Sequence, residues 1–493
     1  MRKWFAVIVT VLCLAVLAGC NKNTFSEHSG EKTGFVSEDF YQGNTSRFMP
    51  EPMLMTEKGY YYYSEGYEGF RYYDIATGKD MYLCNKPECK HDGSAFCVAS
   101  NNKYNVIDYC LYDDCILAYV LEKTDTQQVF KVISLALDGS SLSEVATVMM
   151  LEKTAQSTPE TGGSFYVHRN KALLLMWAEA DEDLGDVVLY GTAFLDLETR
   201  EVTYLDKEPM AIGNTELMHV KAHGDYFYYC KNEGKKGKKK ILHRYHIADG
   251  TDESFSFLVG FNGDYVVVND VTVAYLRKDK SAVCVHHLET GENEEITFDM
   301  AMLYRYNPDG TLMTSSFMED DYTDEELQEI LARGETPEIV ELPWVWYVNN
   351  CPETILSDGD YIYIPMSSER ILSSYIEKQT EDRVFGFFHR DSGEGAWIRV
   401  FDREFNEIAQ INIYDAVEAV RPEGTEWEMK YYSISLRYMG EDIYLELCPK
   451  GNTSEWEVFR CTRAEFLSGN PKFEYVFRMH REQNGDTLLL DSR

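Results

Sequence analysis

Several signatures of enzymes and of nucleic-acid-binding proteins are missing from this chain of 493 residues. It has no Gly-x-Ser-x-Gly nucleophile elbow, no Walker loop and no dinucleotide glycine fingerprint, which excludes the best-defined hydrolase and nucleotide-binding motifs. Positive charge is scarce, because 47 Lys and Arg face 83 Asp and Glu and the formal net charge is −36. Such a chain repels nucleic acid and anionic lipid headgroups. The composition therefore predicts no nucleic-acid partner.

No linker rich in Pro, Gly or Ser interrupts the sequence after residue 46. The remaining stretch is longer than the usual single hydrophobic core, yet closed β-propellers reach this size as one domain. We therefore predict a single domain over residues 47–493.

The apolar run at the N-terminus, Trp4–Ala18, is shorter than the 20 or so residues of a membrane-spanning helix. It follows the charged start Met1–Lys3 and ends in small residues, as an export signal does. We predict that residues 1–19 are a signal peptide and that residues 20–46 are a polar tether rich in Asn, Ser, Glu and Lys.

The end of that signal, Leu17-Ala18-Gly19-Cys20, resembles the lipobox of bacterial lipoproteins. The resemblance implies cleavage before Cys20, acylation of its thiol by fatty acids such as palmitate, and anchoring to the membrane through that lipid. An ordinary signal peptide that happens to carry a cysteine is the alternative.

One short sequence motif, which we call the Gly-Asp phrase, recurs along the chain: a polar turn followed by a run of aromatic or β-branched residues. The copies are Gly224–Tyr228, Gly263–Val267, Gly359–Tyr363, Glu441–Leu445 and, more loosely, Lys58–Tyr62. Such a phrase is typical of a strand that leaves a tight turn. A second set of corners is built from Asp, Thr and Gly, which tolerate left-handed or Asx geometry. These corners are Tyr73–Gly78, Leu135–Gly139, Leu195–Thr199, Tyr245–Gly250 and His287–Gly291.

A repeated antiparallel unit of this length predicts an all-β fold, a β-propeller of four-stranded blades. The expected blade starts lie near Gly59, Tyr109, Val167, Gly224, Gly263, Gly359 and Glu441. We predict seven blades, with six or eight left open because the gap before Gly359 is long.

That gap also contains one predicted helix. Thr323–Glu326 forms a capping box, Leu327, Ile330 and Leu331 form an apolar stripe, and Gly334 is a natural stop. We expect a short helical insertion, which is either a lid beside a ligand site or a loop packed on a blade edge.

Three thiols and one imidazole are concentrated in Cys84, Cys89, His91 and Cys97. These donor types match a closed Cys₃His tetrahedral Zn²⁺ site that would staple the connection between blades 1 and 2. The spacing is not that of a standard zinc finger, and a disulfide among Cys84, Cys89 and Cys97 remains the alternative. Under either interpretation the predicted role is structural rather than catalytic.

Two other cysteine pairs, Cys110 with Cys115 and Cys448 with Cys461, have positions that permit a bridge across neighbouring strands. Each of these cysteines can equally be a small apolar filler.

The lipobox, the Tyr-rich Gly-Asp hairpins and the run Leu83-Cys84-x-x-Pro87-x-Cys89-x-His91 together resemble an uncharacterised group of propeller-type lipoproteins from Gram-positive bacteria. The resemblance covers most of the mature chain. It implies a surface-anchored β-propeller and no assigned reaction.

From these features we predict a monomeric lipoprotein of binding or scaffolding type at the outer face of the cell membrane. Its ligand is an unknown protein or carbohydrate, expected at the face that bears the insertion of residues 319–343. The alternative is an extracytoplasmic carbohydrate-active hydrolase with carboxylates around the propeller channel, because such sites assemble from different blades and leave no local spacing in the sequence.

Overall fold

The computed structural model describes separate stretches of the chain between Phe40 and Ser492. These are residues 40–41, 54–56, 58–64, 69–92, 97–100, 103–124, 126–152, 161–179, 187–206, 209–211, 218–233, 239–256, 258, 261–277, 282–298, 302–306, 314–318, 339–343, 345–347, 351–352, 354–371, 378–380, 383–385, 390–418, 420–421, 431–439, 442–449, 455–481 and 487–492. The chain divides into two compact units, residues 1–33 and 34–493, and every described residue belongs to the second.

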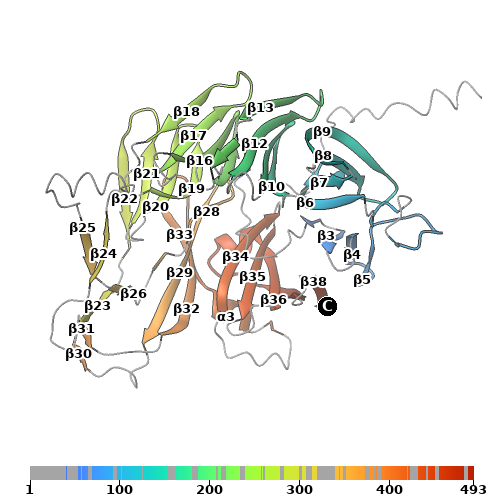
Figure 1. Cartoon of the computed structure of the whole chain (residues 1–493). Helices are drawn as coiled ribbons and strands as arrows, with labels where there is room; N and C mark the ends of the chain where they lie inside the picture. Colours follow the sequence, from blue (N-terminus) through green and yellow to red (C-terminus); the bar gives the residue numbers. More distant parts are fainter. Residues whose placement is uncertain are drawn as a thin grey trace, which may run out of the picture. The chain divides into compact units, whose positions relative to one another are not determined.

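The second unit is a seven-bladed β-propeller, as predicted, and each blade is an antiparallel sheet whose strands follow one another in the sequence (Figure 1). We name the strands of a blade A to D in chain order. Blade 1 contains β2 (Leu54–Met55), β3 (Gly59–Ser64), β4 (Gly69–Asp74) and β5 (Lys79–Tyr82). Blade 2 contains β6 (Tyr104–Tyr112), β7 (Cys115–Lys123), β8 (Gln127–Ala136) and β9 (Leu142–Glu152). Blade 3 contains β10 (Thr161–His168), β11 (Lys171–Glu179), β12 (Val187–Asp196) and β13 (Val202–Asp206).

Blades 4 to 7 continue the same order. Blade 4 contains β15 (Met218–His223), β16 (Tyr226–Glu233), β17 (Lys239–His246) and β18 (Asp252–Phe255), and blade 5 contains β19 (Phe261–Asn269), β20 (Thr272–Arg277), β21 (Ala282–His287) and β22 (Asn293–Thr297). In blade 6, strand A is formed by β27 (Cys351–Pro352) and β28 (Leu356–Ser357), followed by β29 (Ile362–Ile371), β32 (Arg390–Phe401) and β33 (Glu407–Asn412). Blade 7 contains β34 (Tyr431–Met439), β35 (Asp442–Pro449), β36 (Glu455–Thr462) and β37 (Glu474–Arg481).

Additional strands extend this framework. β1 (Phe40–Tyr41) joins β15, β14 (Pro209–Ala211) joins β12, and β38 (Thr487–Ser492) is a fifth strand of blade 7. Two small sheets lie outside the blades, and neither is an eighth blade. They are β26 (Val345–Tyr347), β23 (Met302–Tyr306), β31 (Arg383–Phe385) and β30 (Lys378–Thr380), and the pair β24 (Thr314–Met318) and β25 (Ile339–Pro343). The predicted helix of residues 323–334 lies outside the described residues.

The C–D corners have the geometry that their composition predicts. In blade 1, Asp74 Oδ1 accepts hydrogen bonds from the N–H groups of Ala76 (2.8 Å) and Thr77 (3.3 Å), and Gly78 takes a positive φ of 64°. The same left-handed position is occupied by Gly250 in blade 4 and by Gly291 in blade 5, with φ of 75° and 74°. The left-handed glycine is thus common to these three blades. The capping Asp recurs in blade 3, where Asp196 Oδ1 accepts from the N–H groups of Glu198 and Thr199 and Arg200 takes the positive φ.

The Gly-Asp phrases mark strand turns in some blades but not in all. Gly224 (φ 54°) and Gly359 (φ 92°) do form A–B turns. The prediction of a turn at Gly263 is wrong, because that glycine lies inside strand A of blade 5, where the register shifts between Phe261 and Tyr265. A strand bulge and a tight turn favour the same small and polar residues, so the phrase alone does not separate them.

The A–B turns and C–D corners share one end of the propeller, which we call the turn face. Within blades, Ile247 N–H donates to Asp225 O (2.8 Å) and Leu288 N–H to Val271 O (2.7 Å), joining corner to turn. Between blades, His223 Nδ1 lies 2.6 Å from Asp270 Oδ1, joining the A–B turn of blade 4 to that of blade 5. We call the opposite end, where the B–C and D–A connections leave the strands, the loop face.

Blades pack on one another through apolar side chains, and blade 7 packs on blade 1 to close the ring. The closing cluster joins Tyr60, Tyr62 and Tyr73 of blade 1 to Tyr444, Trp456, Val458 and Phe477 of blade 7. No strand is exchanged between these two blades in the described part of the chain. Closure therefore depends on side-chain packing.

Two short helices, neither of them predicted, are described in the C-terminal part of the chain. They are α3 (Ile413–Glu418) and α4 (Arg463–Leu467). α4 has a complete capping box between Thr462 and Glu465, a signature that is readable in the sequence. Among the described residues, no helix has the length and apolar character to span a bilayer.

Candidate metal centre

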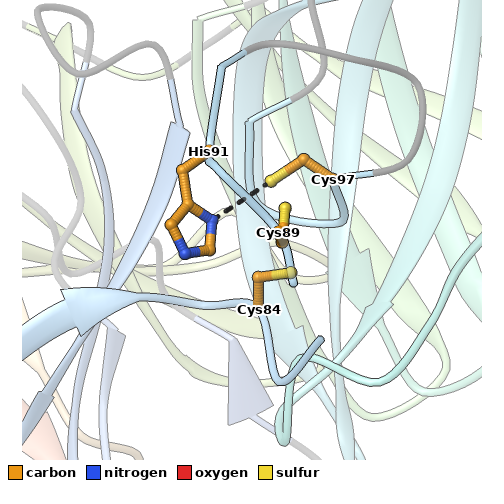
Figure 2. A group of neighbouring side chains, drawn as sticks. All are labelled: Cys84, Cys89, His91 and Cys97. Carbon is orange, nitrogen blue, oxygen red and sulfur yellow. Dashed lines mark hydrogen bonds between the residues drawn. The ribbon is translucent and has the colours of Figure 1, made fainter. Parts of the chain in front are cut away.

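The connection between β5 and β6 brings together all four residues of the predicted metal site. The donor atoms of Cys84, Cys89, His91 and Cys97 all lie within 4.8 Å of one another (Figure 2). His91 Nδ1 is 3.5 Å from Cys97 Sγ. One nitrogen and three sulfur donors at such separations match the ligand set of a tetrahedral structural zinc site.

The local backbone explains why ligands spaced along the connection meet. Leu83 N–H donates to Phe70 O (2.9 Å), so the chain leaves β5 still bonded to β4. Cys89 N–H then donates to Lys86 O (3.0 Å), and His91 adopts a positive φ of 53°, which reverses the chain. On its return the connection accepts a hydrogen bond from Phe70 N–H at Ala99 O (3.0 Å). Both ends are therefore fixed to the same strand of blade 1.

Blade 2 holds the connection from its other side. Gly139, in the C–D corner of that blade, has a φ of 68°, and a Cβ built on it would lie 2.7 Å from Cys84 N and 2.8 Å from Cys84 Cα. Its carbonyl also accepts a hydrogen bond from Asn85 N–H (3.2 Å). Only glycine allows this close approach in this backbone conformation. The candidate metal centre thus lies where blade 1 meets blade 2.

Aromatic and ionic contacts orient the histidine. The Tyr82 ring stacks on the His91 ring, with centroids 4.6 Å apart and planes inclined by 18°. The guanidinium carbon of Arg71 lies 4.8 Å from the centre of the Tyr82 ring, and Arg71 is paired with Asp80 at 2.9 Å. The stacked ring restricts rotation of the His91 imidazole, and the contacts of Arg71 hold the Tyr82 ring in turn. The sequence predicted Gly139 as a corner residue but did not connect it, Tyr82 or Arg71 with the candidate metal site, since each acts through a contact made in the folded chain.

Backbone N–H groups point at the sulfur atoms. Ser100 N–H lies 3.2 Å from Cys97 Sγ and donates to it. Burial alone would raise the pKa of Cys84, but hydrogen bonds from the Lys86 and Val98 N–H groups and from the neighbouring thiols hold that pKa below its usual value. Burial raises the pKa of Cys97 to about 12. The thiols are therefore unequal, and the deepest one most needs a cation to lose its proton.

The cluster has no feature of a catalytic metal site. Four protein ligands complete a tetrahedron, whereas catalytic zinc sites keep one position open for water or substrate. Cys84, Cys89 and Cys97 are free thiols in the structure, so all three remain available as ligands. The arrangement can hold a metal ion with four protein ligands.

The other predicted cysteine sites are not brought together as bridges. Cys110, Cys115 and Cys461 are free thiols. Cys110 is opposite Leu117 in the ladder, Cys115 is opposite Tyr112, and Cys461 is opposite Ile443 rather than Cys448. These residues act as apolar fillers of the blades. The predicted lipidation site, Cys20, lies outside the described residues.

Comparison with known proteins gives no family for this chain. No family model matches it, and no curated protein matches it. Solved structures with a similar course of the chain include KlHsv2 with loop 6CD replaced by a Gly-Ser linker, 9% identical, with a TM-score of 0.35 over 87% of this chain and 98% of that one. A puromycin-hydrolyzing peptidase of Mycobacterium tuberculosis is 9% identical, with a TM-score of 0.42 over 91% of this chain and 56% of that one.

A GH43_1 enzyme from Xanthomonas citri complexed with xylose is 8% identical, with a TM-score of 0.21 over 78% of this chain and 91% of that one. At such low identities and scores these similarities carry no argument about activity. The propeller assignment rests on the strand pairing of this chain.

Proposed function

We propose that Cys84, Cys89, His91 and Cys97 hold one structural Zn²⁺ that fixes the connection between blades 1 and 2. The observation that supports this most strongly is the placement of four donor atoms within 4.8 Å, in a set that matches the preferences of zinc. The close approach of Gly139 to Cys84 gives the ion a mechanical consequence, because the bound loop is also the contact surface for blade 2.

The test is the metal content of the purified protein, measured by inductively coupled plasma mass spectrometry. We expect about one Zn²⁺ per chain in the unaltered protein and its loss in a Cys97→Ser variant. Cys284→Ser is the matched control, because Cys284 is also a buried free thiol but lies in blade 5, away from the cluster. The disulfide would be supported instead by a protein without metal whose intact mass is two hydrogen atoms below that of the fully reduced chain, and whose full mass returns after treatment with a reductant.

We further propose that this propeller is a lipid-anchored protein of binding or scaffolding type at the outer face of the cell membrane. The lipobox ending at Cys20 supports the location. Two carboxylates, one part-buried and one buried, make contacts between blades. Asp108 accepts hydrogen bonds from the N–H groups of Tyr109 (2.9 Å) and Phe165 (3.0 Å), tying blade 2 to blade 3. Asp358 accepts from the Tyr363 hydroxyl (2.6 Å) and pairs with Arg463 at 3.1 Å, tying blade 6 to blade 7.

These carboxylates hold blades together, whereas a glycoside hydrolase needs an acid and a base directed at a sugar.

A Cys20→Ala variant tests the location. We expect this variant to be lost from the membrane fraction of the producing cells and to keep the same fold by circular dichroism. Retention of the variant on membranes contradicts the lipid anchor. Release of reducing sugar from cell-wall or plant polysaccharides by the purified protein would contradict the binding class and favour the hydrolase.

A further inference from the structure

The four candidate ligands come from two limbs of the connection between blades 1 and 2. Cys84, Cys89 and His91 belong to the outgoing limb, residues 83–92, whereas Cys97 belongs to the returning limb, residues 97–100. The Cys97 side chain points toward the other three (Figure 2). An ion held by all four residues therefore joins the two limbs to each other.

The thiols of the two limbs differ in exposure. Cys84 and Cys89, on the outgoing limb, are half-buried. Cys97 is only 1% exposed and belongs to the apolar core between blades 1 and 2, where its sulfur accepts a hydrogen bond from Ser100 N–H (3.2 Å). An oxidant dissolved in water attacks accessible thiols first. Two of the three thiols are therefore open to oxidation.

The two accessible thiols are also placed for bonding to each other. The chain between them turns back on itself, with Cys89 N–H donating to Lys86 O (3.0 Å). The sulfur atoms of Cys84 and Cys89 lie within 4.8 Å of one another. A disulfide needs them about 2 Å apart, so they have to approach by less than about 3 Å. Since both thiols lie on the outgoing limb, this approach needs no movement of Cys97 in the core.

The returning limb packs incompletely against the blades. Val98 and Ala99 line a small cavity together with Tyr63 of blade 1 and Ile133 of blade 2. Side chains that border a cavity lose packing contacts on that side. The backbone holds this limb through the hydrogen bond from Phe70 N–H to Ala99 O (3.0 Å). An ion that binds Cys97 adds a second tie at a place where packing is weak.

We propose that Cys84 and Cys89 are a site of reversible oxidation, at which hydrogen peroxide converts the two thiolates into a disulfide and displaces Zn²⁺ from the connection. This inference rests on the zinc site proposed above. One thiolate attacks a peroxide oxygen, the O–O bond breaks, and a sulfenic acid and water form with uptake of one proton. The second thiolate then displaces the sulfenic oxygen, which leaves as water with another proton, and the S–S bond forms.

The two electrons that reduce the peroxide thus come from the two thiolates. Cys97 takes up a proton as the ion leaves, and with His91 it supplies only two of the four ligands of a structural zinc site. The disulfide closes the outgoing limb on itself, whereas the ion joined both limbs. Oxidation therefore weakens the junction between blades 1 and 2, although it adds a covalent bond.

The full-length protein, reduced and then supplied with Zn²⁺, is treated with hydrogen peroxide in the presence of a chromogenic zinc chelator. We expect release of about one Zn²⁺ per chain, a disulfide between Cys84 and Cys89 by peptide mapping, and recovery of the zinc after reduction. Cys97 should stay a thiol, as should Cys284, a buried free thiol of blade 5 that serves as internal control. Zinc that stays bound under peroxide overturns this inference and leaves the zinc site standing. A reduced chain that takes up no zinc overturns both.

Two variants identify the reacting pair without depending on zinc. Cys97→Ser keeps both accessible thiols and should still form the disulfide under peroxide, whereas Cys84→Ser leaves Cys89 with only the buried thiol and should form none. Each variant lacks one zinc ligand, so the comparison is matched. A disulfide that includes Cys97, or a Cys97→Ser variant that forms none, overturns the assignment.

Amide hydrogen exchange measures the effect on the junction. We expect faster exchange at residues 97–100 in the oxidised protein than in the reduced, zinc-bound protein. Exchange in β20 and β21 of blade 5 should be the same in both states. Equal exchange at residues 97–100 in the two states overturns the weakening of the junction.

Discussion

Two junctions in this propeller join similar sheets by different means. Between blades 7 and 1 the contact is made by side chains of the strands themselves, in the aromatic cluster around Tyr60 and Phe477. Between blades 1 and 2 the core includes Cys97, Val98 and Ala99, which belong to the connection and not to any strand. A strand is held by its ladder, whereas a long connection must be fixed by other contacts before it can fill a core. The comparison indicates why the four candidate metal ligands are found at the second junction.

The largest effect is expected at the aromatic junction. Phe477 is fully buried, and its ring meets the Tyr60 ring of blade 1 edge-on, with centroids 5.1 Å apart. A Phe477→Ala substitution should lower the free energy of unfolding by about 4 kcal/mol, since it removes a large side chain and leaves a cavity. Phe130→Ala, at an equally buried position in blade 2, is the control. Both variants lose stability by chemical denaturation, but only Phe477→Ala should speed amide hydrogen exchange in β3 and β4.

A chelator should destabilise the junction between blades 1 and 2 but should not affect the aromatic junction between blades 7 and 1. For free Zn²⁺ at roughly a hundredfold its Kd, removing the ion costs about 3 kcal/mol of unfolding free energy. Calorimetry with and without a strong chelator measures this, and the Cys97→Ser variant should show no further loss when the chelator is added. The loss of unfolding free energy caused by Phe477→Ala should be the same with or without chelator, because free-energy changes at distant, independent sites are additive. A chelator effect that persists in Cys97→Ser would assign the metal to other ligands.

The connection that carries Cys84, Cys89, His91 and Cys97, here called the metal loop, contacts blade 2, and this contact can be weakened separately. A Gly139→Ala substitution places a methyl group against the Cys84 backbone at a φ of 68°. We expect a loss of about 2 kcal/mol and weaker zinc retention against a competing chelator. Gly291→Ala is the matched control, because Gly291 has a φ of 74° in the corner of blade 5 but nothing lies within 4 Å of the added atom. If both variants lose zinc equally, the contact at Cys84 does not hold the site.

The two kinds of junction were not equally predictable from the sequence. Blade corners are local: Asp74 caps the N–H groups of residues that follow it, and Gly78 supplies the left-handed turn, so pattern alone predicts them. The motif around Cys84 named the residues that converge, but their convergence depends on the bond between Phe70 and Ala99, which no spacing rule contains. β1 could not be foreseen, because two residues in a polar segment give no strand period. The capping box of α4 was readable at Thr462 and Glu465 and was missed.

The smallest effect concerns charges on blade 2, at the same junction as the metal loop. Lys131 lies 2.7 Å from a carboxylate oxygen of Glu122 and 2.7 Å from one of Glu144. Burial alone would raise the pKa of Glu122, but hydrogen bonds from Lys131 and Lys103 hold it below its usual value. The hydrogen bond from Lys131 likewise lowers the pKa of Glu144.

Because both pKa values are lower in the folded state than in the unfolded chain, these carboxylates add stability above the unfolded pKa of about 4.3. That stability is lost as the pH falls through the folded-state values. A Lys131→Met variant should therefore be less stable than the unaltered protein by about 1 kcal/mol at pH 7, and the difference should shrink below about pH 4. Denaturant titrations at both pH values, with Lys79→Met on the exposed strand β5 as control, measure it. A difference independent of pH would mean that Lys131 stabilises blade 2 by packing of its aliphatic chain rather than by its charge.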